Sequence, residues 1–130
     1  MSPKLILHID DDDDDLQILR EAIETNEAFL LKQYSNGKDG LRFLEQAKVL
    51  GDVPCLIILD MNMPVLNGKD VVLQIKNDKA LSHVSVIIFT TTTGFSDLEF
   101  CRKHAVSVIV KPFTINEFDV VVKKILSHAS

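Results

Sequence analysis

Acidic, hydroxyl and amine side chains follow four apolar segments of this 130-residue sequence, and together they could bind a cation. They are Asp10 and Asp11 after residues 5–9, Asp60 after 55–59, Thr90 after 84–89 and Lys111 after 106–110. Three carboxylates brought together repel one another, by about 4 kcal/mol for each pair at about 4 Å and an effective dielectric constant near 20. A hard divalent cation compensates for this charge best. Because no His or Cys stands among the candidate ligands, the oxygen donors favour Mg²⁺, with Mn²⁺ as an alternative, over zinc.

The acidic pair opens a run of six aspartates, Asp10–Asp15, and the rest of this run has a simpler explanation. Aspartates suit the N-cap and the first turn of a helix, where backbone N–H groups lack partners. We therefore interpret Asp13, Asp14 and Asp15 as a solvated acidic patch with a helix N-cap inside the run. A calcium-binding EF-hand loop is excluded, because its sixth position requires glycine for a sharp turn and here that position is Asp15.

Five short segments have the composition of β-strands, and helical patterns lie between them. The segments are LILHI (5–9), FLLKQY (29–34), CLIIL (55–59), VSVIIF (84–89) and VSVIV (106–110). All except the second are nearly continuous in apolar residues, which is typical of parallel strands buried on both faces. The intervening segments repeat apolar residues every three to four positions, as helices with one buried face do. The sequence thus predicts a three-layer α/β fold with a doubly wound parallel sheet, which binds ligands at the carboxyl ends of its strands.

Composition indicates a globular single domain, with 46% hydrophobic and 25% charged residues. The net charge of −5 comes from the aspartate run, because the other 13 acidic residues nearly balance 14 basic ones. Without a basic stripe, direct nucleic-acid binding is not predicted. The first apolar stretch is too short for a signal peptide or a membrane span, so we expect a cytoplasmic protein that does not bind membranes. Cys55 and Cys101 match no metal-ligand spacing and are expected to be free thiols.

Several separated motifs resemble the receiver domain of bacterial two-component response regulators, of which a chemotaxis receiver is an example. They are the acidic pair in IDD (9–11), the block LDMNMPVLNG (59–68), a threonine thirty residues after Asp60, and KPF (111–113). Each motif alone is weak, but their order and spacing are specific, and the similarity extends from Lys4 to about Leu126. The resemblance implies the flavodoxin-like strand order 2-1-3-4-5. We expect one receiver domain over residues 1–130, without an output domain, because the chain ends about four residues after its last helical pattern.

In that family, a histidine kinase or a histidine phosphotransfer protein passes a phosphoryl group to the aspartate that closes the third strand. Carried over to this sequence, the resemblance makes Asp60 the phosphoacceptor. It also implies that Mg²⁺ is held by Asp10, Asp11, Asp60 and the backbone carbonyl of Asn62. Such a site is chemically reasonable, because a carboxylate accepts a phosphoryl group when a metal and a lysine neutralise the transferring oxygens.

The same resemblance implies that Thr90 hydrogen-bonds to the phosphoryl oxygens and that Lys111 forms an ion pair with them. The chain would then be a phosphoacceptor module rather than an enzyme, and it would signal by binding a downstream protein target. The Lys111–Pro112 bond is a candidate cis peptide, because that isomer costs an X-Pro bond only about 0.5 to 1 kcal/mol.

One position departs from the common receiver pattern in a way that bears on switching. Val108 stands where many receivers have a Tyr or Phe that turns inward on activation. We therefore predict that switching runs through the loop and helix of residues 91–104, with Val108 nearly passive. Three further residues are interpreted as packing residues: His8, Phe89 and Phe113.

Two other functions are consistent with parts of the pattern. Mg²⁺-dependent aspartyl-phosphate phosphatases of the haloacid dehalogenase superfamily also place an aspartate after a strand, but they carry a second aspartate two residues on as general acid. Here that position is Asn62, an amide that cannot transfer a proton, so a phosphatase is disfavoured. A degenerate receiver that only binds a partner is disfavoured as well, because every site position of the family is filled.

Overall fold

The structure, a computed structural model, describes residues 2–91 and 93–129, in which strands and helices alternate along the chain. The strands are β1 (Lys4–Ile9), β2 (Phe29–Tyr34), β3 (Leu56–Leu59), β4 (Ser85–Thr90) and β5 (Ser107–Val110). The helices are α1 (Asp13–Glu24), α2 (Gly37–Leu50), α3 (Gly68–Lys76), α4 (Phe95–Lys103) and α5 (Ile115–Leu126), followed by the 3₁₀ turn η1 (Ser127–Ala129). The five predicted strands are confirmed, and the ends of each shift by no more than one residue.

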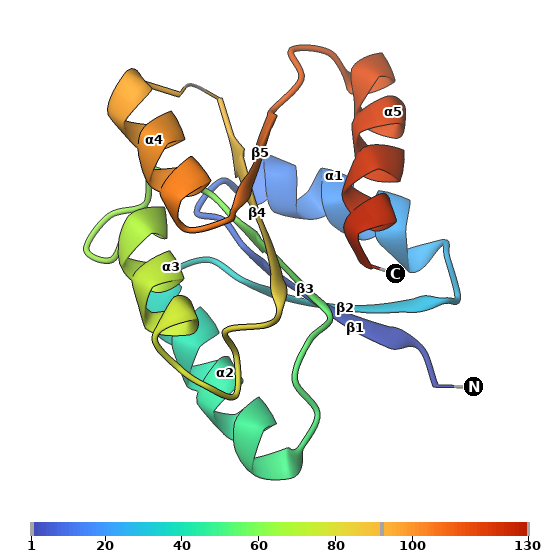
Figure 1. Ribbon diagram of the computed structural model, residues 1–130. Helices are drawn as coiled ribbons and strands as arrows, with labels where there is room; N and C mark the ends of the chain where they lie inside the picture. The colour runs from blue at the N-terminus through green and yellow to red at the C-terminus, as the bar shows by residue number, and fades with distance from the viewer. Residues whose placement is uncertain (1, 92, 130) are drawn as a thin grey trace.

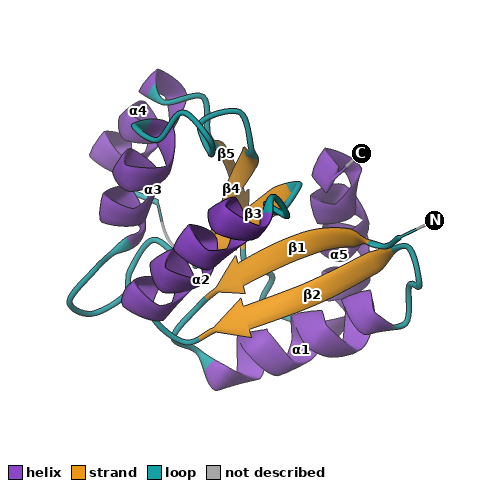
Figure 2. Ribbon diagram, turned by 90° about the horizontal axis from the view of Figure 1, so that it is seen from below, coloured by secondary structure: helices purple, strands orange, loops and turns teal. Residues whose placement is uncertain are grey.

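The strands form one parallel sheet in the order β2-β1-β3-β4-β5, which confirms the predicted topology. Helices α1 and α5 cover one face of the sheet, and α2, α3 and α4 cover the other (Figures 1 and 2). Since all the strands run in the same direction, their carboxyl ends lie along a single edge of the sheet. Residues that follow the strands are therefore gathered at that edge, far apart in sequence but close in space.

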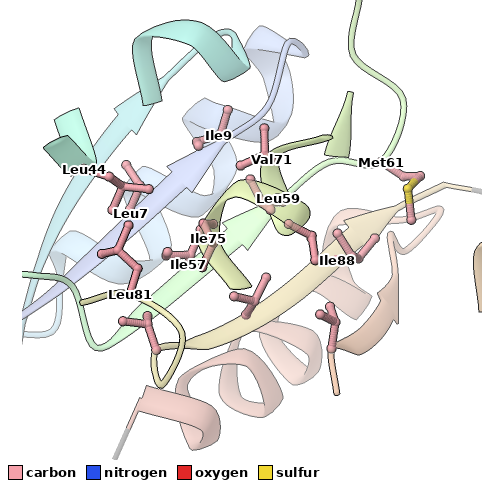
Figure 3. Close-up of a cluster of buried hydrophobic side chains, with 14 of the residues drawn as sticks. Leu7, Ile9, Leu44, Ile57, Leu59, Met61, Val71, Ile75, Leu81 and Ile88 are labelled. Carbon is pink, nitrogen blue, oxygen red and sulfur yellow. The ribbon is translucent and has the colours of Figure 1, made fainter. Parts of the chain in front are cut away.

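The core consists of two buried clusters, one on each face of the sheet. Figure 3 shows the cluster beneath α2, α3 and α4, where Leu7 and Ile9 of β1 pack against Val71 and Ile75 of α3. Alternate residues of the same strands, such as Ile6, belong to the other cluster, beneath α1 and α5. The central strands β1, β3 and β4 are thus buried on both faces, as their continuous apolar composition predicts.

Two sequence-based expectations about burial are wrong, and the structure also defines the isomer of the Lys111–Pro112 bond, which the sequence leaves open. Strand β5 is not buried on both faces: within residues 2–91 and 93–129 it pairs with β4 alone and forms an edge of the sheet, and its Val110 is 50% exposed. Phe113 is not a packing residue, because it lies in the loop after β5 and is 94% exposed. The Lys111–Pro112 peptide is trans. Phe89, in contrast, is confirmed as a buried residue and packs edge-on against Phe118.

Two other features agree with the sequence. Cys55 and Cys101 are both free thiols, and Cys101 is buried in the core. Among residues 2–91 and 93–129, the structure contains no helix with the length and apolar composition needed to cross a membrane.

Candidate functional site

Three carboxylates meet where β1 and β3 end. One oxygen from each of Asp10, Asp11 and Asp60 lies within 4.8 Å of the others. The two strands are neighbours, with Ile9 opposite Leu59, so the aspartates that follow them leave the sheet side by side. Asp10 and Asp60 are buried, whereas Asp11 is exposed. The structure therefore brings together the three acidic residues that the sequence predicts at this edge.

The two buried carboxyl groups have opposite pKa shifts. Burial, and after it the charge of Asp10, raises the pKa of Asp60 to about 6, although Lys111 and the backbone N–H of Asn62 act in the other direction. Burial also acts to raise the pKa of Asp10, but contacts with His8 and Lys111 outweigh it and hold that pKa below its usual value. Asp10 is thus ionised at neutral pH, and the ionisation of Asp60 depends on the positive charge beside it.

Lys111 reaches the acidic cluster from the end of β5. Its Nζ lies 2.9 Å from Asp10, 2.7 Å from Asp15 and 3.8 Å from Asp60. Its backbone N–H donates to the carbonyl of Thr90 at 2.7 Å, which fixes the lysine beside the end of β4. Burial acts to lower the pKa of Lys111, but its contacts with Asp15 and Asp10 raise that pKa well above the usual value. The lysine is therefore a permanent cation within the site.

Thr90 and Asn62 also lie at the predicted edge. Thr90 is the last residue of β4 and is fully buried. Asn62 is exposed in the loop after β3, and its backbone N–H donates to the carboxylate of Asp60. This loop is held against α3 at Gly68, where a Cβ atom would lie 2.6 Å from the carbonyl oxygen of Asp60 and 2.9 Å from the Cα of Met61. Only glycine allows the helix to approach the backbone of the site this closely.

Asp15 belongs to the site, contrary to its interpretation as part of a solvated patch. Asp12 is the N-cap of α1, and its side chain accepts hydrogen bonds from the backbone N–H groups of Asp14 and Asp15. With this start, Asp15 lies four residues before the buried Leu19, on the same face of the helix. Its side chain is only 14% exposed and pairs with Lys111. Asp14, like Asp13, is exposed as predicted.

His8 is a buried strand residue, as predicted, but it also contacts the site. Its Nε2 lies 3.6 Å from Oδ2 of Asp10, and its Nδ1 lies 3.0 Å from Nε2 of Gln33. Sequence reasoning missed this polar contact because His8 stands inside an apolar run. A signal was available, since His8 stands two positions before Asp10 in an extended segment, and side chains two positions apart in such a segment point to the same face of the sheet.

A doubly wound 2-1-3-4-5 sheet with a buried aspartate, an acidic pair, a threonine and a lysine at its carboxyl edge defines a receiver domain. The chain belongs to the family described as "Response regulator receiver domain", which matches residues 6–123. It is therefore a receiver domain of phosphorelay signalling, and it belongs to a family of signalling proteins.

Individual relatives agree with this assignment. Response regulator Rcp1 of Synechocystis is 29% identical over 102 residues, which cover 74% of this chain and 67% of Rcp1. The polar-differentiation response regulator DivK of Brucella anthropi is 26% identical over 128 residues, which cover 98% of this chain and 99% of DivK. Among solved structures, the Mn(2+)-bound form of Rcp1 matches with a TM-score of 0.85 and 26% identity, over 96% of this chain and 93% of that one.

Proposed function

We propose that Asp60 accepts a phosphoryl group from a histidine kinase or a histidine phosphotransfer protein, in a reaction that depends on Mg²⁺. The single receiver domain of residues 1–130 then signals by binding a downstream protein, and it is a phosphoacceptor rather than an enzyme. The observation that carries the proposal is the placement of Asp60, which is buried, within 4.8 Å of two further carboxylates and 3.8 Å from Lys111.

The donor set fits a hard divalent cation. Three carboxylates that supply one oxygen each, close together and without a nitrogen or sulfur ligand, suit Mg²⁺ or Mn²⁺. The Mn(2+)-bound form of Rcp1, a relative of similar fold, supports a divalent metal here. Asp10, Asp11, Asp60 and the backbone carbonyl of Asn62 would hold the ion. When bound, it supplies positive charge that offsets the repulsion among the carboxylates and the charge of the transferring phosphoryl oxygens.

The transfer itself needs an ionised acceptor. In the reaction a bond forms between an Asp60 carboxylate oxygen and phosphorus, while the bond between phosphorus and the imidazole nitrogen of the donor histidine breaks. Because the pKa of Asp60 is raised to about 6, added positive charge favours its nucleophilic, deprotonated form. In this proposal Lys111 would form an ion pair with the transferred oxygens, and Thr90 would donate its hydroxyl hydrogen to them.

Labelling with a small phosphodonor tests the proposal without knowledge of the kinase. With acetyl phosphate and Mg²⁺, the wild type should gain one phosphoryl group in intact-mass spectra, and EDTA should prevent it. Asp60→Asn should gain none. Asp52→Asn, at an exposed aspartate in the loop between α2 and β3, is the matched control and should be labelled like the wild type. Equal labelling of Asp60→Asn and the wild type would overturn the assignment.

A further inference from the structure

His8 is a buried polar side chain that the proposed function leaves without a role. It is fully buried on β1. Its Nε2 has no hydrogen-bond partner within residues 2–91 and 93–129, and the polar atom that it faces is Oδ2 of Asp10, at 3.6 Å. That distance is a few tenths of an ångström beyond an ordinary hydrogen bond. Buried polar atoms normally find partners, so this near contact requires an explanation.

Gln33, on the neighbouring strand β2, determines which ring nitrogen of His8 carries a hydrogen. Nε of Arg20 can only donate, and it lies 2.9 Å from Oε1 of Gln33. The backbone carbonyl of Leu16 can only accept, and it lies 2.7 Å from Nε2 of Gln33. Both contacts are satisfied in one orientation of the Gln33 amide alone. The amide nitrogen of Gln33 must therefore face His8.

This orientation fixes the tautomer of His8. One N–H of the Gln33 amide donates to Leu16, and the other is directed at Nδ1 of His8, 3.0 Å away. Nδ1 must then accept, so it carries no hydrogen. A ring whose Nδ1 bears no hydrogen is neutral. A neutral imidazole with a bare Nδ1 carries its hydrogen on Nε2, and that N–H faces Asp10.

We propose that His8 is a positioning residue, whose Nε2–H donates to Oδ2 of Asp10 and holds this carboxylate in place as a metal ligand. The inference rests on the proposed function. Lys111 lies 2.9 Å from the same oxygen of Asp10. When Lys111 turns toward a phosphoryl group on Asp60, His8 remains as the donor to that buried oxygen. A short shift of the carboxylate closes the 3.6 Å contact.

The arrangement is a chain of polar contacts from the surface to the site. Arg20, exposed on α1, orients Gln33, which fixes the tautomer of His8, which in turn faces Asp10. Partners that orient metal ligands typically change metal affinity by about 10- to 100-fold when they are removed. A role for His8 as a phosphoryl carrier is excluded by its complete burial.

The first test is made on the wild type. In ¹⁵N NMR spectra of the histidine rings at neutral pH, the signals absent from His8→Leu belong to His8. They should show a hydrogen on Nε2 and an unprotonated Nδ1. A hydrogen on Nδ1, or a doubly protonated ring, would overturn the inference whatever the variants do.

The second test measures Mg²⁺ affinity by calorimetry. His8→Leu removes the Nε2–H donor, and Gln33→Leu removes the hydrogen bond that keeps Nδ1 of His8 without a hydrogen. Each variant should bind Mg²⁺ about 10-fold or more weakly than the wild type. Gln33→Leu should also increase the fraction of His8 with its hydrogen on Nδ1. Gln17→Leu is the matched control, because Gln17 is exposed on α1 and its side chain hydrogen-bonds to Glu21. The Mg²⁺ affinity of this variant should equal that of the wild type.

The outcomes separate the two proposals. If the wild type binds no Mg²⁺, the proposed metal site fails, and the role of His8 fails with it. If the wild type binds Mg²⁺ and both variants bind it equally well, only the role of His8 is overturned.

Discussion

The side-chain nitrogen of Lys111 lies 2.7 Å from the carboxylate of Asp15, in the first turn of α1. The same nitrogen lies 3.8 Å from Asp60, the proposed acceptor. The lysine is therefore held by a carboxylate that takes no part in the proposed reaction. Any contact between Lys111 and a phosphoryl group competes with this ion pair.

Asp15→Asn should accelerate phosphorylation by acetyl phosphate, because it frees Lys111 and removes a negative charge near the incoming anion. If the lost ion pair contributes about 1 kcal/mol, the rate should rise about fivefold. Asp14→Asn removes one charge from the same turn at an exposed position and serves as the control. The prediction fails if Asp15→Asn is labelled no faster than Asp14→Asn.

A second prediction concerns stability and pH in the absence of metal. The pKa of Asp60 is raised to about 6 in the folded protein, against about 3.9 in an unfolded chain. The folded state binds the proton of the Asp60 carboxyl group more tightly than the unfolded chain does. The contribution of Asp60 to the free energy of unfolding is therefore complete below about pH 4 and is lost as the pH rises through about 6. In EDTA, Asp60→Asn should match the wild type near pH 4.

At pH 8 the same variant should be more stable than the wild type by about 2 kcal/mol, since it lacks the strained negative charge. Urea unfolding at both pH values measures this difference. If the difference in unfolding free energy between Asp60→Asn and the wild type does not increase with pH, the surroundings of Asp60 do not destabilise its charged form. Mg²⁺ should stabilise the wild type at pH 8 and leave Asp60→Asn less affected.

A third prediction concerns Gly68, where α3 lies against the backbone of Asp60 and Met61. In Gly68→Ala the new Cβ atom meets backbone atoms of Asp60 and Met61 at 2.6 and 2.9 Å, so the chain itself must shift. We expect a loss of about 1 to 3 kcal/mol in unfolding free energy, together with weaker Mg²⁺ binding. Gly94→Ala is the control, because the nearest atom to its Cβ would be 3.9 Å away. Similar losses in both variants would contradict this explanation.

The fourth prediction concerns how phosphorylation reaches the surface. Val108 is partly buried and packs against the core cluster beneath α4, and it has no ring that could turn into vacated space. We expect beryllofluoride, a phosphoryl mimic, to shift the amide NMR signals of α4 in the wild type and in Val108→Ala. Thr90→Ala should bind the mimic and lose most of these shifts, because the hydroxyl that draws the loop inward is absent. The reverse pattern would assign the switch to β5.

The sequence predicts the sheet and the ends of its strands well, because both follow from local composition and from the direction of parallel strands. Asp10, Asp60 and Lys111 could be found in this way. The exposure of Val110 on β5 could not be predicted in this way, because it depends on the position of β5 at the edge of the described sheet rather than on the residue type. The prediction that Phe113 packs in the core is wrong for a related reason, since apolar composition does not reveal whether other residues cover a loop side chain.

Asp15 was missed for a different physical reason. In a run of identical residues, composition does not indicate where the helix begins. The N-cap at Asp12 decides which later carboxylate turns toward Lys111 and which faces solvent. The sequence correctly predicts that His8 is buried, but its contact with Asp10 depends on the orientation of Gln33, on another strand. Such contacts depend on tertiary structure.

The six aspartates also have a consequence for deletions. The run supplies the acidic cluster at its beginning, the cap of α1 at Asp12 and the partner of Lys111 at its end. Loss of one aspartate would leave the first five positions unchanged, but Leu16 would take the place of Asp15. Each helical residue turns by about 100°, so Leu19 and Ile23 would rotate away from the core. The length of the run, rather than its charge, fixes the rotational phase of α1 against the sheet.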